Sequence, residues 1–349
     1  MTSRRVALSI LLLVAACSSS GGGGSSSGGD PVGGTGPATV AAYCDAYWSA
    51  YAARRAACGR GSAADAAAVY APAARCADPV RAVAAGRATY DASGAGACLS
   101  FIETASCDVL ESFMNGAYPQ AACAAAIAGK LADGDSCYSH ESCASGVCIF
   151  SPNACPSTCV TLTPSGSPCQ PGVPCAAGSF CNILLATPAC TPLSQLDGPC
   201  MNDAWCGPGL FCEFISLQSN GCRARATSGS CTSDNQCAIG YRCSNASTCV
   251  AWRAAGESCT QGENACGPGL WCGAGGTCVD GPKPSEACGT VNGEDRPCIG
   301  GWCSSSGTAY VCAAWLAPGG TCSLASQCSP TDVCDTAGTA KCTTLCAEP

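Results

Sequence analysis

Apolar and polar positions follow a helical period near the start of the segment from residue 38 to residue 132. One face of the pattern recurs every three or four residues: Val40, Cys44, Tyr47, Trp48, Tyr51, Arg55 and Cys58. This spacing places side chains on one side of an α-helix. Gly59 and Gly61 follow and predict its end. We expect the aromatic members of this face to form core, with a ligand site as the alternative.

Further helices are expected in the same segment. Asp78 followed by Pro79 has the order of an N-cap and a first helical residue, and predicts a helix to about Tyr90. Two more helices are expected at 97–106 and 118–130. The segment contains six cysteines: Cys44, Cys58, Cys76, Cys98, Cys107 and Cys123. They permit three bridges in several connectivities, so we expect a small all-α domain stapled by disulfides.

From residue 133 to residue 349 cysteine sets the pattern instead. Seven units, each C-x5-C-x5-C or a variant followed by a fourth cysteine, begin 28 to 34 residues apart. The units contain Cys137, Cys143, Cys148, Cys155 and Cys159; Cys169, Cys175, Cys181 and Cys190; Cys200, Cys206, Cys212 and Cys222; Cys231, Cys237, Cys243 and Cys249; Cys259, Cys266, Cys272 and Cys278; Cys288, Cys298, Cys303 and Cys312; Cys322, Cys328, Cys334, Cys342 and Cys346. We interpret them as tandem repeats.

Glycine and an apolar residue hold regular places in these repeats. Glycines shortly before the first and third cysteines predict turns beside bridged strands. An apolar residue precedes most third cysteines: Val147, Phe180, Phe211, Trp271, Trp302 and Val333. Arg242 is the exception, with Tyr241 beside it. We expect each ring to pack on the disulfides of its own repeat; the alternative is a row of exposed rings that stack on sugars.

A repeat of this size holds too few apolar side chains to fold by burial alone. The large ones of the fourth repeat are Ile239, Tyr241, Val250 and Trp252. Ordering costs about 1.5 kcal/mol per residue, whereas each disulfide across such a loop contributes roughly 3 kcal/mol. We therefore expect structural disulfides and an oxidising compartment. The fold class is small disulfide-rich repeats of short strands and turns, preceded by the helical domain.

The spacing leaves the bridge partners open. We expect first-to-third and second-to-fourth pairing in the five middle repeats, with another closed set as the alternative. The first and last repeats hold five cysteines each. Spacing does not decide whether Cys155 or Cys159, and Cys342 or Cys346, is the odd one. If every thiol is bridged, the odd pair crosses repeats, joins the helical domain, or links two molecules into a dimer.

Metal and cofactor sites are not expected. Zinc sites built on cysteine usually contain C-x2-C pairs, and the chain has neither these nor closer pairs. His140 is the only histidine. The same scarcity argues against an enzyme, because most nucleophilic and acid–base sites use histidine.

Charge is concentrated in the repeats. Residues 133–349 carry seven basic and sixteen acidic side chains, a net charge of −9. Because nucleic-acid binding needs a basic surface, we expect no nucleic-acid partner. The acidic excess is interpreted as a solubility device, with weak cation binding as the alternative.

The N-terminus has the pattern of a lipoprotein export signal. Residues 1–16 combine Arg4 and Arg5 with an apolar run too short to span a bilayer. The run ends Val-Ala-Ala-Cys17, which resembles a bacterial lipobox and implies lipid attachment to Cys17; an ordinary secretory peptide is the alternative. Residues 17–37 are the lipidated cysteine and a Gly/Ser tether. Ser18 after the cysteine favours the outer membrane by analogy.

Two resemblances extend this interpretation. The segments 86–91, 97–99 and 122–123, followed by Gly134-x2-Cys137, resemble the cysteine-rich lipoproteins common in myxobacteria. The repeats, as in Cys231-x5-Cys237-x2-Gly240-x2-Cys243, are similar to the Dickkopf N-terminal cysteine-rich domain. The first resemblance implies a surface lipoprotein of unassigned function. Dickkopf proteins bind Wnt co-receptors, but no residue outside the cysteine frame carries that activity over.

Three classes of function remain. The expected one is a lipid-anchored surface module that binds an unknown protein or polysaccharide, or has a structural role. The second is a protease inhibitor or effector that presents disulfide-braced loops. The third is an enzyme, which the missing site chemistry disfavours.

The lipobox generates the first prediction. Cys17→Ser removes the sulfur that accepts the lipid, so the variant should leave the membrane fraction for the soluble fraction. Fractionation of expressing cells, with Ser18→Ala as the control that keeps the lipobox, measures this. Membrane retention of Cys17→Ser equal to that of the control would disprove the anchor.

Overall fold

The computed structural model describes residues 36–71, 75–110, 121–151, 154–169, 174–214, 220–260, 265–291, 294–296, 298–306, 309–329, 332–335 and 338–344. The expected export signal, Cys17 and nearly all of the tether lie outside these residues. The side chain of Cys155 and the whole of Cys346 also lie outside them. No helix within the described ranges is long and apolar enough to cross a bilayer.

The first predicted helix forms with its expected bounds. Helix α1 (Val40–Ala57) begins after Thr39, whose hydroxyl accepts a hydrogen bond from the Ala42 N–H at 3.2 Å. Gly59 follows in the left-handed region at φ +69° and permits the chain to turn. A short helix that the apolar pattern did not predict comes next: α2 (Ala63–Val69), with Ser62 at its N-cap.

The second predicted helix is shorter than expected. Helix α4 (Ala77–Ala84) has Cys76 at its N-cap, whereas Asp78 lies inside its first turn and pairs with Arg81 at 2.6 Å. Gly86, at φ +72°, follows the end of the helix. The residues up to Tyr90 are then strand β1 (Ala88–Tyr90), which pairs antiparallel with β2 (Ile127–Gly129). The prediction of helix to Tyr90 was wrong because pairing with a distant segment overrides local propensity.

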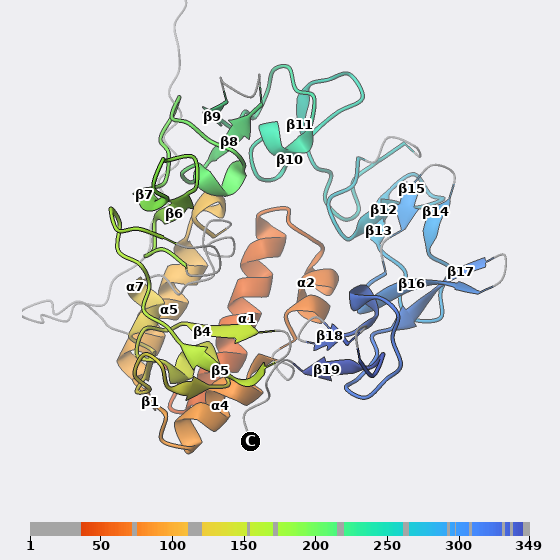
Figure 1. Ribbon diagram of the computed structural model, residues 1–349. Coiled ribbons are helices and arrows are strands. Elements are labelled where there is room, and N and C mark those ends of the chain that lie inside the picture. The colour runs from red at the N-terminus through yellow and green to blue at the C-terminus, as the bar shows by residue number, and fades with distance from the viewer. Residues whose placement is uncertain are drawn as a thin grey trace, which may run out of the picture. The chain divides into compact units, whose positions relative to one another are not determined.

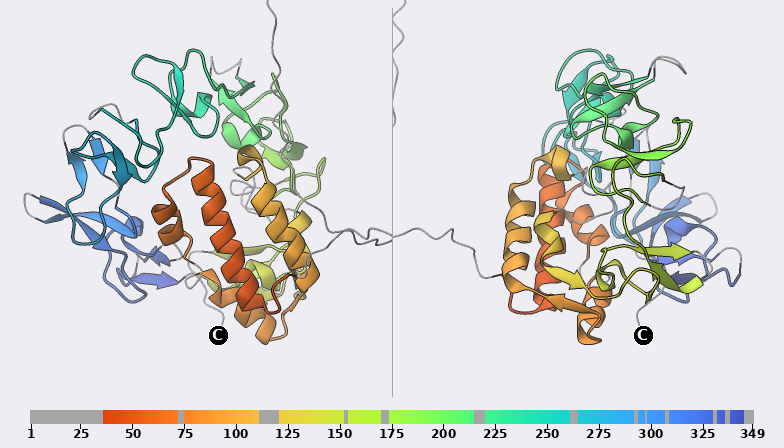
Figure 2. Two further views of the ribbon diagram at one scale, coloured as in Figure 1. Left: turned by 180° about the vertical axis from the view of Figure 1, so that it is seen from behind. Right: turned by 60° about the vertical axis from the view of Figure 1, so that its left-hand side comes forward.

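The remaining helices shift in the same way. Helix α5 (Ala92–Thr104) starts before the predicted 97–106, because the Asp91 carboxylate accepts the Ser93 N–H at 3.0 Å and caps it. Of the helix predicted at 118–130, residues 118–120 lie outside the described residues; the described part is α7 (Ala121–Ala124), after which the chain enters β2 instead of continuing as helix. Helices α1 and α5 lie side by side in both views of Figure 2.

Aromatic rings and disulfides fill the interior of the helical domain. Tyr51 and Ile102 are fully buried, and the ring of Trp48 stacks on that of Tyr70 with centroids 5.9 Å apart. The predicted aromatic face is therefore core. Three bridges cross this domain: Cys44–Cys76, Cys58–Cys107 and Cys98–Cys123.

Each repeat is built on a short antiparallel hairpin (Figure 1). The hairpins in chain order are β4 (Cys148–Ser151) with β5 (Ala154–Cys159), β6 (Ser179–Asn182) with β7 (Ala189–Pro192), β8 (Leu210–Glu213) with β9 (Gly221–Ala224), β10 (Tyr241–Cys243) with β11 (Cys249–Ala251), β12 (Leu270–Cys272) with β13 (Cys278–Asp280), β16 (Gly301–Ser306) with β17 (Ala309–Ala314), and β18 (Asp332–Cys334) with β19 (Cys342–Thr344). The first repeat adds β3 (Ser136–Cys137) to β5, and the sixth adds the pair β14 (Gly289–Val291) and β15 (Glu294–Arg296).

One disulfide pattern holds every repeat, and it is the first of the two alternatives. First and third cysteines are joined in Cys137–Cys148, Cys169–Cys181, Cys200–Cys212, Cys231–Cys243, Cys259–Cys272, Cys288–Cys303 and Cys322–Cys334. Second and fourth are joined in Cys143–Cys159, Cys175–Cys190, Cys206–Cys222, Cys237–Cys249, Cys266–Cys278, Cys298–Cys312 and Cys328–Cys342. The fourth cysteines of the end repeats are thus Cys159 and Cys342.

The third and fourth cysteines also face each other across each hairpin. In the fourth repeat Cys243 is opposite Cys249 in the strand register, yet each is bonded to a cysteine outside the hairpin. The two bridges therefore tie the hairpin to the loop that precedes it. The bridged sulfurs form the buried cluster of the repeat, with Tyr241 packed against it.

A short 3₁₀ turn precedes the hairpin in four repeats: η1 (His140–Ser142), η2 (Asp203–Trp205), η3 (Asp234–Gln236) and η4 (Ala325–Gln327). The first side chain of the turn accepts the backbone N–H of the third cysteine in three of them. Asp203 accepts from Cys212 at 2.8 Å, and Asp234 accepts from Cys243 at 2.7 Å. His140 Nδ1 accepts from Cys148 at 3.1 Å, so the single histidine has the structural role of an aspartate.

This role generates a pH prediction. Burial lowers the pKa of His140 from its ordinary 6.5, because the charged ring is desolvated. Between that lowered pKa and about 6.5 the unfolded chain binds a proton that the native chain does not. The stability of the first repeat should therefore fall as the pH drops below about 6.5.

A proton NMR titration measures this directly, since one histidine gives one set of ring signals. We expect a midpoint below about 6.5. His140→Asp, which copies the third and fourth repeats, should fold and lose the dependence that the imidazole causes. A midpoint at or above the ordinary value would refute the buried acceptor role.

Candidate functional site

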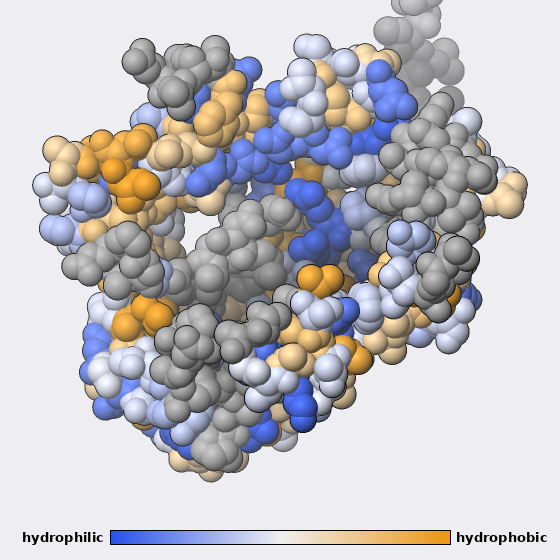
Figure 3. Space-filling model, turned by 45° about the vertical axis from the view of Figure 1, so that its right-hand side comes forward, coloured by the Kyte–Doolittle hydropathy of each residue, from blue (hydrophilic) through white to orange (hydrophobic). Residues whose placement is uncertain are grey.

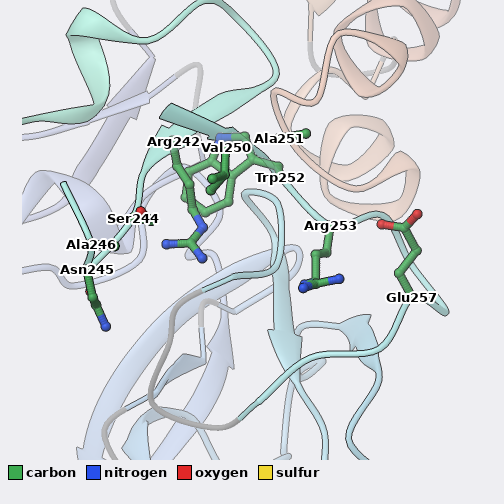
Figure 4. A pocket seen from close by; sticks show the side chains of 9 residues that line it. All are labelled: Arg242, Ser244, Asn245, Ala246, Val250, Ala251, Trp252, Arg253 and Glu257. Carbon is green, nitrogen blue, oxygen red and sulfur yellow. The ribbon is translucent and has the colours of Figure 1, made fainter. Parts of the chain in front are cut away.

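The fourth repeat and the segment that follows it line a hollow of about 490 Å³ (Figure 4). Its walls are Arg242, Ser244, Asn245, Ala246, Val250, Ala251, Trp252, Arg253 and Glu257. We call this set the Arg242 hollow. All nine residues come from one short stretch of chain, so the geometry depends on a single hairpin and its exit.

Arg242 occupies the place that other repeats give to a core side chain. It stands before the third cysteine and pairs with Val250 across the hairpin. In the neighbouring repeats Phe211 and Trp271 hold the same position. Arg242 is correspondingly only 8% exposed, and its guanidinium carbon lies 5.8 Å from the centroid of the Trp252 ring. A charged group has therefore replaced a ring in the interior of the repeat.

No ion pair offsets this burial within the part of the chain that the structure describes. The Nε of Arg242 is enclosed and has no hydrogen-bond partner. Two other arginines of the repeats do have ion pairs: Arg223 pairs with Glu213 at 3.0 Å, and Arg225, whose Nε also has no hydrogen-bond partner, pairs with Asp203 at 3.7 Å. Because burying a charge without a partner is unfavourable, Arg242 is a feature that repeat stability does not explain.

The backbone holds Arg253 as a second cation of the hollow. Its N–H donates to the carbonyl of Ala265 and its carbonyl accepts from Gly267, both at 3.0 Å. Figure 4 shows the guanidinium groups of Arg242 and Arg253 extending to the same side of the strand. The one acid of the lining, Glu257, is engaged elsewhere, since its Oε2 accepts the Ala254 N–H at 2.7 Å.

The four rings of the repeats do not form an exposed row. Phe211 is buried, while Phe180, Trp271 and Trp302 are half-buried. The Trp271 Nε1–H donates to the carbonyl of Asp280 at 3.1 Å. Three of the four rings thus keep part of their surface accessible, and stacking on sugars stays an untested alternative.

Phe180 also corrects the expected interpretation. Its ring stacks on Trp205 of the next repeat, with centroids 4.3 Å apart, and packs on the Cys200–Cys212 bridge cluster there. The cysteine spacing assigns Phe180 to the second repeat, but it cannot predict a contact with a residue of the third. Packing in this array therefore crosses at least one repeat boundary.

The sulfur clusters would suit a metal ion only if the thiols were free. In the second repeat the sulfurs of Cys169, Cys175 and Cys190 lie within 4.8 Å of one another. The structure joins them in the bridges Cys169–Cys181 and Cys175–Cys190. A disulfide offers no thiolate to a metal, so these clusters serve as core.

A comparison with known protein families finds a match that includes part of the Arg242 hollow. Residues 199–248 match the Dickkopf N-terminal cysteine-rich region. The match spans the third repeat and most of the fourth, including Arg242. Neither a curated protein nor a solved structure matches the chain. The cysteine-rich repeats thus indicate an extracellular binding or structural module.

Proposed function

We propose that the chain is a lipid-anchored binding module of the cell surface, held by Cys17 to the outer membrane of a two-membrane cell. The lipobox-like Val-Ala-Ala-Cys17 and the Gly/Ser tether support the anchor. The likeness to cysteine-rich lipoproteins of the myxobacterial type supports the setting. Disulfides in every repeat fit an oxidising, extracytoplasmic compartment.

The observation that carries the binding role is the construction of the repeats. Two bridges per repeat fix each hairpin without a large apolar core. The side chains of the loops and of the Arg242 hollow are therefore not needed for a core and are available for binding. Preorganised loops bind at a lower entropic cost than mobile ones. On the face in Figure 3 the described residues form hydrophobic patches beside hydrophilic ones.

We propose that the chain has no catalytic role. His140, the residue that general acid–base chemistry would most readily use, accepts the N–H of Cys148 through Nδ1. This contact occupies the ring nitrogen that a catalytic base would offer. The lining of the Arg242 hollow contains arginines and one carboxylate but no histidine or thiol.

A second candidate is a protease inhibitor. The turn between β6 and β7 carries Ile183, Leu184 and Leu185, which are 54%, 61% and 43% exposed. The Cys169–Cys181 and Cys175–Cys190 bridges hold the two strands that present this turn. Exposed apolar side chains on a braced loop are what a protease cleft would accept, so this turn favours the alternative.

Parallel assays separate the candidates. The soluble Cys17→Ser form should be retained on envelope polysaccharide, whereas the reduced and alkylated chain should not. A panel of extracellular proteases should show neither inhibition nor altered turnover. Stoichiometric inhibition that Leu184→Asp abolishes would establish the inhibitor instead. Equal retention of the native and reduced chains would contradict the requirement for braced hairpins.

A further inference from the structure

We propose that the Arg242 hollow binds the carboxylate of an acidic sugar residue in a polysaccharide. This inference rests on the proposed binding function and specifies the ligand class. The hollow lies within one repeat and its exit segment, and its volume of about 490 Å³ is in the range of sites for small ligands.

Arg242 is the reason to expect an anionic group on the ligand. The side chain is nine-tenths buried, and within the described residues no carboxylate pairs with it. A planar guanidinium donates two parallel hydrogen bonds to a carboxylate, and such charge-assisted contacts are among the strongest in proteins. A bound carboxylate would supply the ion-pair partner that the described residues do not provide.

The surroundings favour an anion at this place in an otherwise acidic array. Residues 133–349 have a net charge of −9, yet the lining of the hollow holds two arginines and one glutamate. The glutamate is Glu257, whose carboxylate accepts a backbone N–H. With Arg242, Arg253 leaves the lining with one more positive than negative charge, and Figure 4 shows both guanidinium groups on the same side of the strand.

The other walls fit a sugar better than a bare ion. Asn245 adds an amide to the lining, which can pair with ring hydroxyls, and Ser244 adds a hydroxyl that is hydrogen-bonded to Thr248 at 3.0 Å. Trp252 adds a half-buried aromatic ring. A simple anion would use the guanidinium groups alone and leave the rest of the hollow to water. A uronic acid uses the cations, the polar groups and the ring together.

The neighbouring repeats supply the decisive variant. Arg242→Phe installs the side chain that Phe211 has at the same position, so the fold should be retained and thermal stability should not fall. Arg253→Gln removes the second cation from an exposed position. Arg223→Gln is the matched control, because it removes an arginine of the third repeat that lies outside the hollow and pairs with Glu213.

Calorimetric titration of the soluble Cys17→Ser chain with oligoglucuronate tests the proposal, with the neutral oligoglucose of equal length beside it. Oligoglucuronate should bind, and added salt should weaken it. Arg242→Phe should weaken binding by about tenfold or more, Arg253→Gln by less, and Arg223→Gln not at all. Acetate and a peptide with a free C-terminus should bind more weakly than oligoglucuronate.

Each contrary result would refute a different claim: the site, the class of ligand, or the proposed function. Wild-type affinity in Arg242→Phe, or equal binding of the neutral sugar, refutes the site while leaving envelope retention by the whole chain intact. Equal or tighter binding of acetate or the peptide refutes the saccharide assignment. A different result would refute the proposed function and leave this site standing: the soluble Cys17→Ser chain is not retained on envelope polysaccharide, yet it binds oligoglucuronate in a way that depends on Arg242.

Discussion

The fold of the cysteine-rich repeats depends on one constraint, the pair of interlaced disulfides in each repeat. The bonds from first to third and from second to fourth cysteine attach each hairpin to the loop before it. Each closes a loop of 11 to 16 residues, worth roughly 3 kcal/mol. The sulfurs also form the buried cluster, so cross-link and core are the same atoms. Because bridges provide most of the stability, a repeat can place an unusual residue in its interior and still fold.

Arg242 shows the consequence. In a domain held by apolar burial, a buried guanidinium without a partner would be strongly destabilising. Here the Cys231–Cys243 and Cys237–Cys249 bonds fix the hairpin whatever precedes the third cysteine. The same repeat frame that holds Phe211 in one copy can therefore hold a buried guanidinium in the next. The disulfide frame is thus constant, while the residue before the third cysteine varies, which suits an extracellular binding or structural module whose successive repeats differ in chemistry.

The sequence predicts local features well and non-local ones poorly. The period from Val40 to Cys58 places α1 because the signal lies within the helix itself. The pairing of β1 with β2 was not predicted, because contacts between strands distant in sequence produce no local sequence pattern. For this reason the helix that was expected to reach Tyr90 ends at Ala84. The stacking of Phe180 on Trp205 was hidden for the same reason. Arg242 could be recognised in the sequence as an exception to the repeat pattern. That its Nε has no hydrogen-bond partner among the described residues, and that a hollow lies beside it, could be found only from the three-dimensional structure.

Disulfide mapping of the native protein tests this account most directly. Digestion at low pH without reduction, followed by mass spectrometry, should yield peptides that join first to third and second to fourth cysteines, such as Cys231 with Cys243 and Cys237 with Cys249. Low pH suppresses exchange because the thiolate is the attacking species. A bond between the facing residues Cys243 and Cys249, or bridges from the middle repeats to the helical domain, would contradict it.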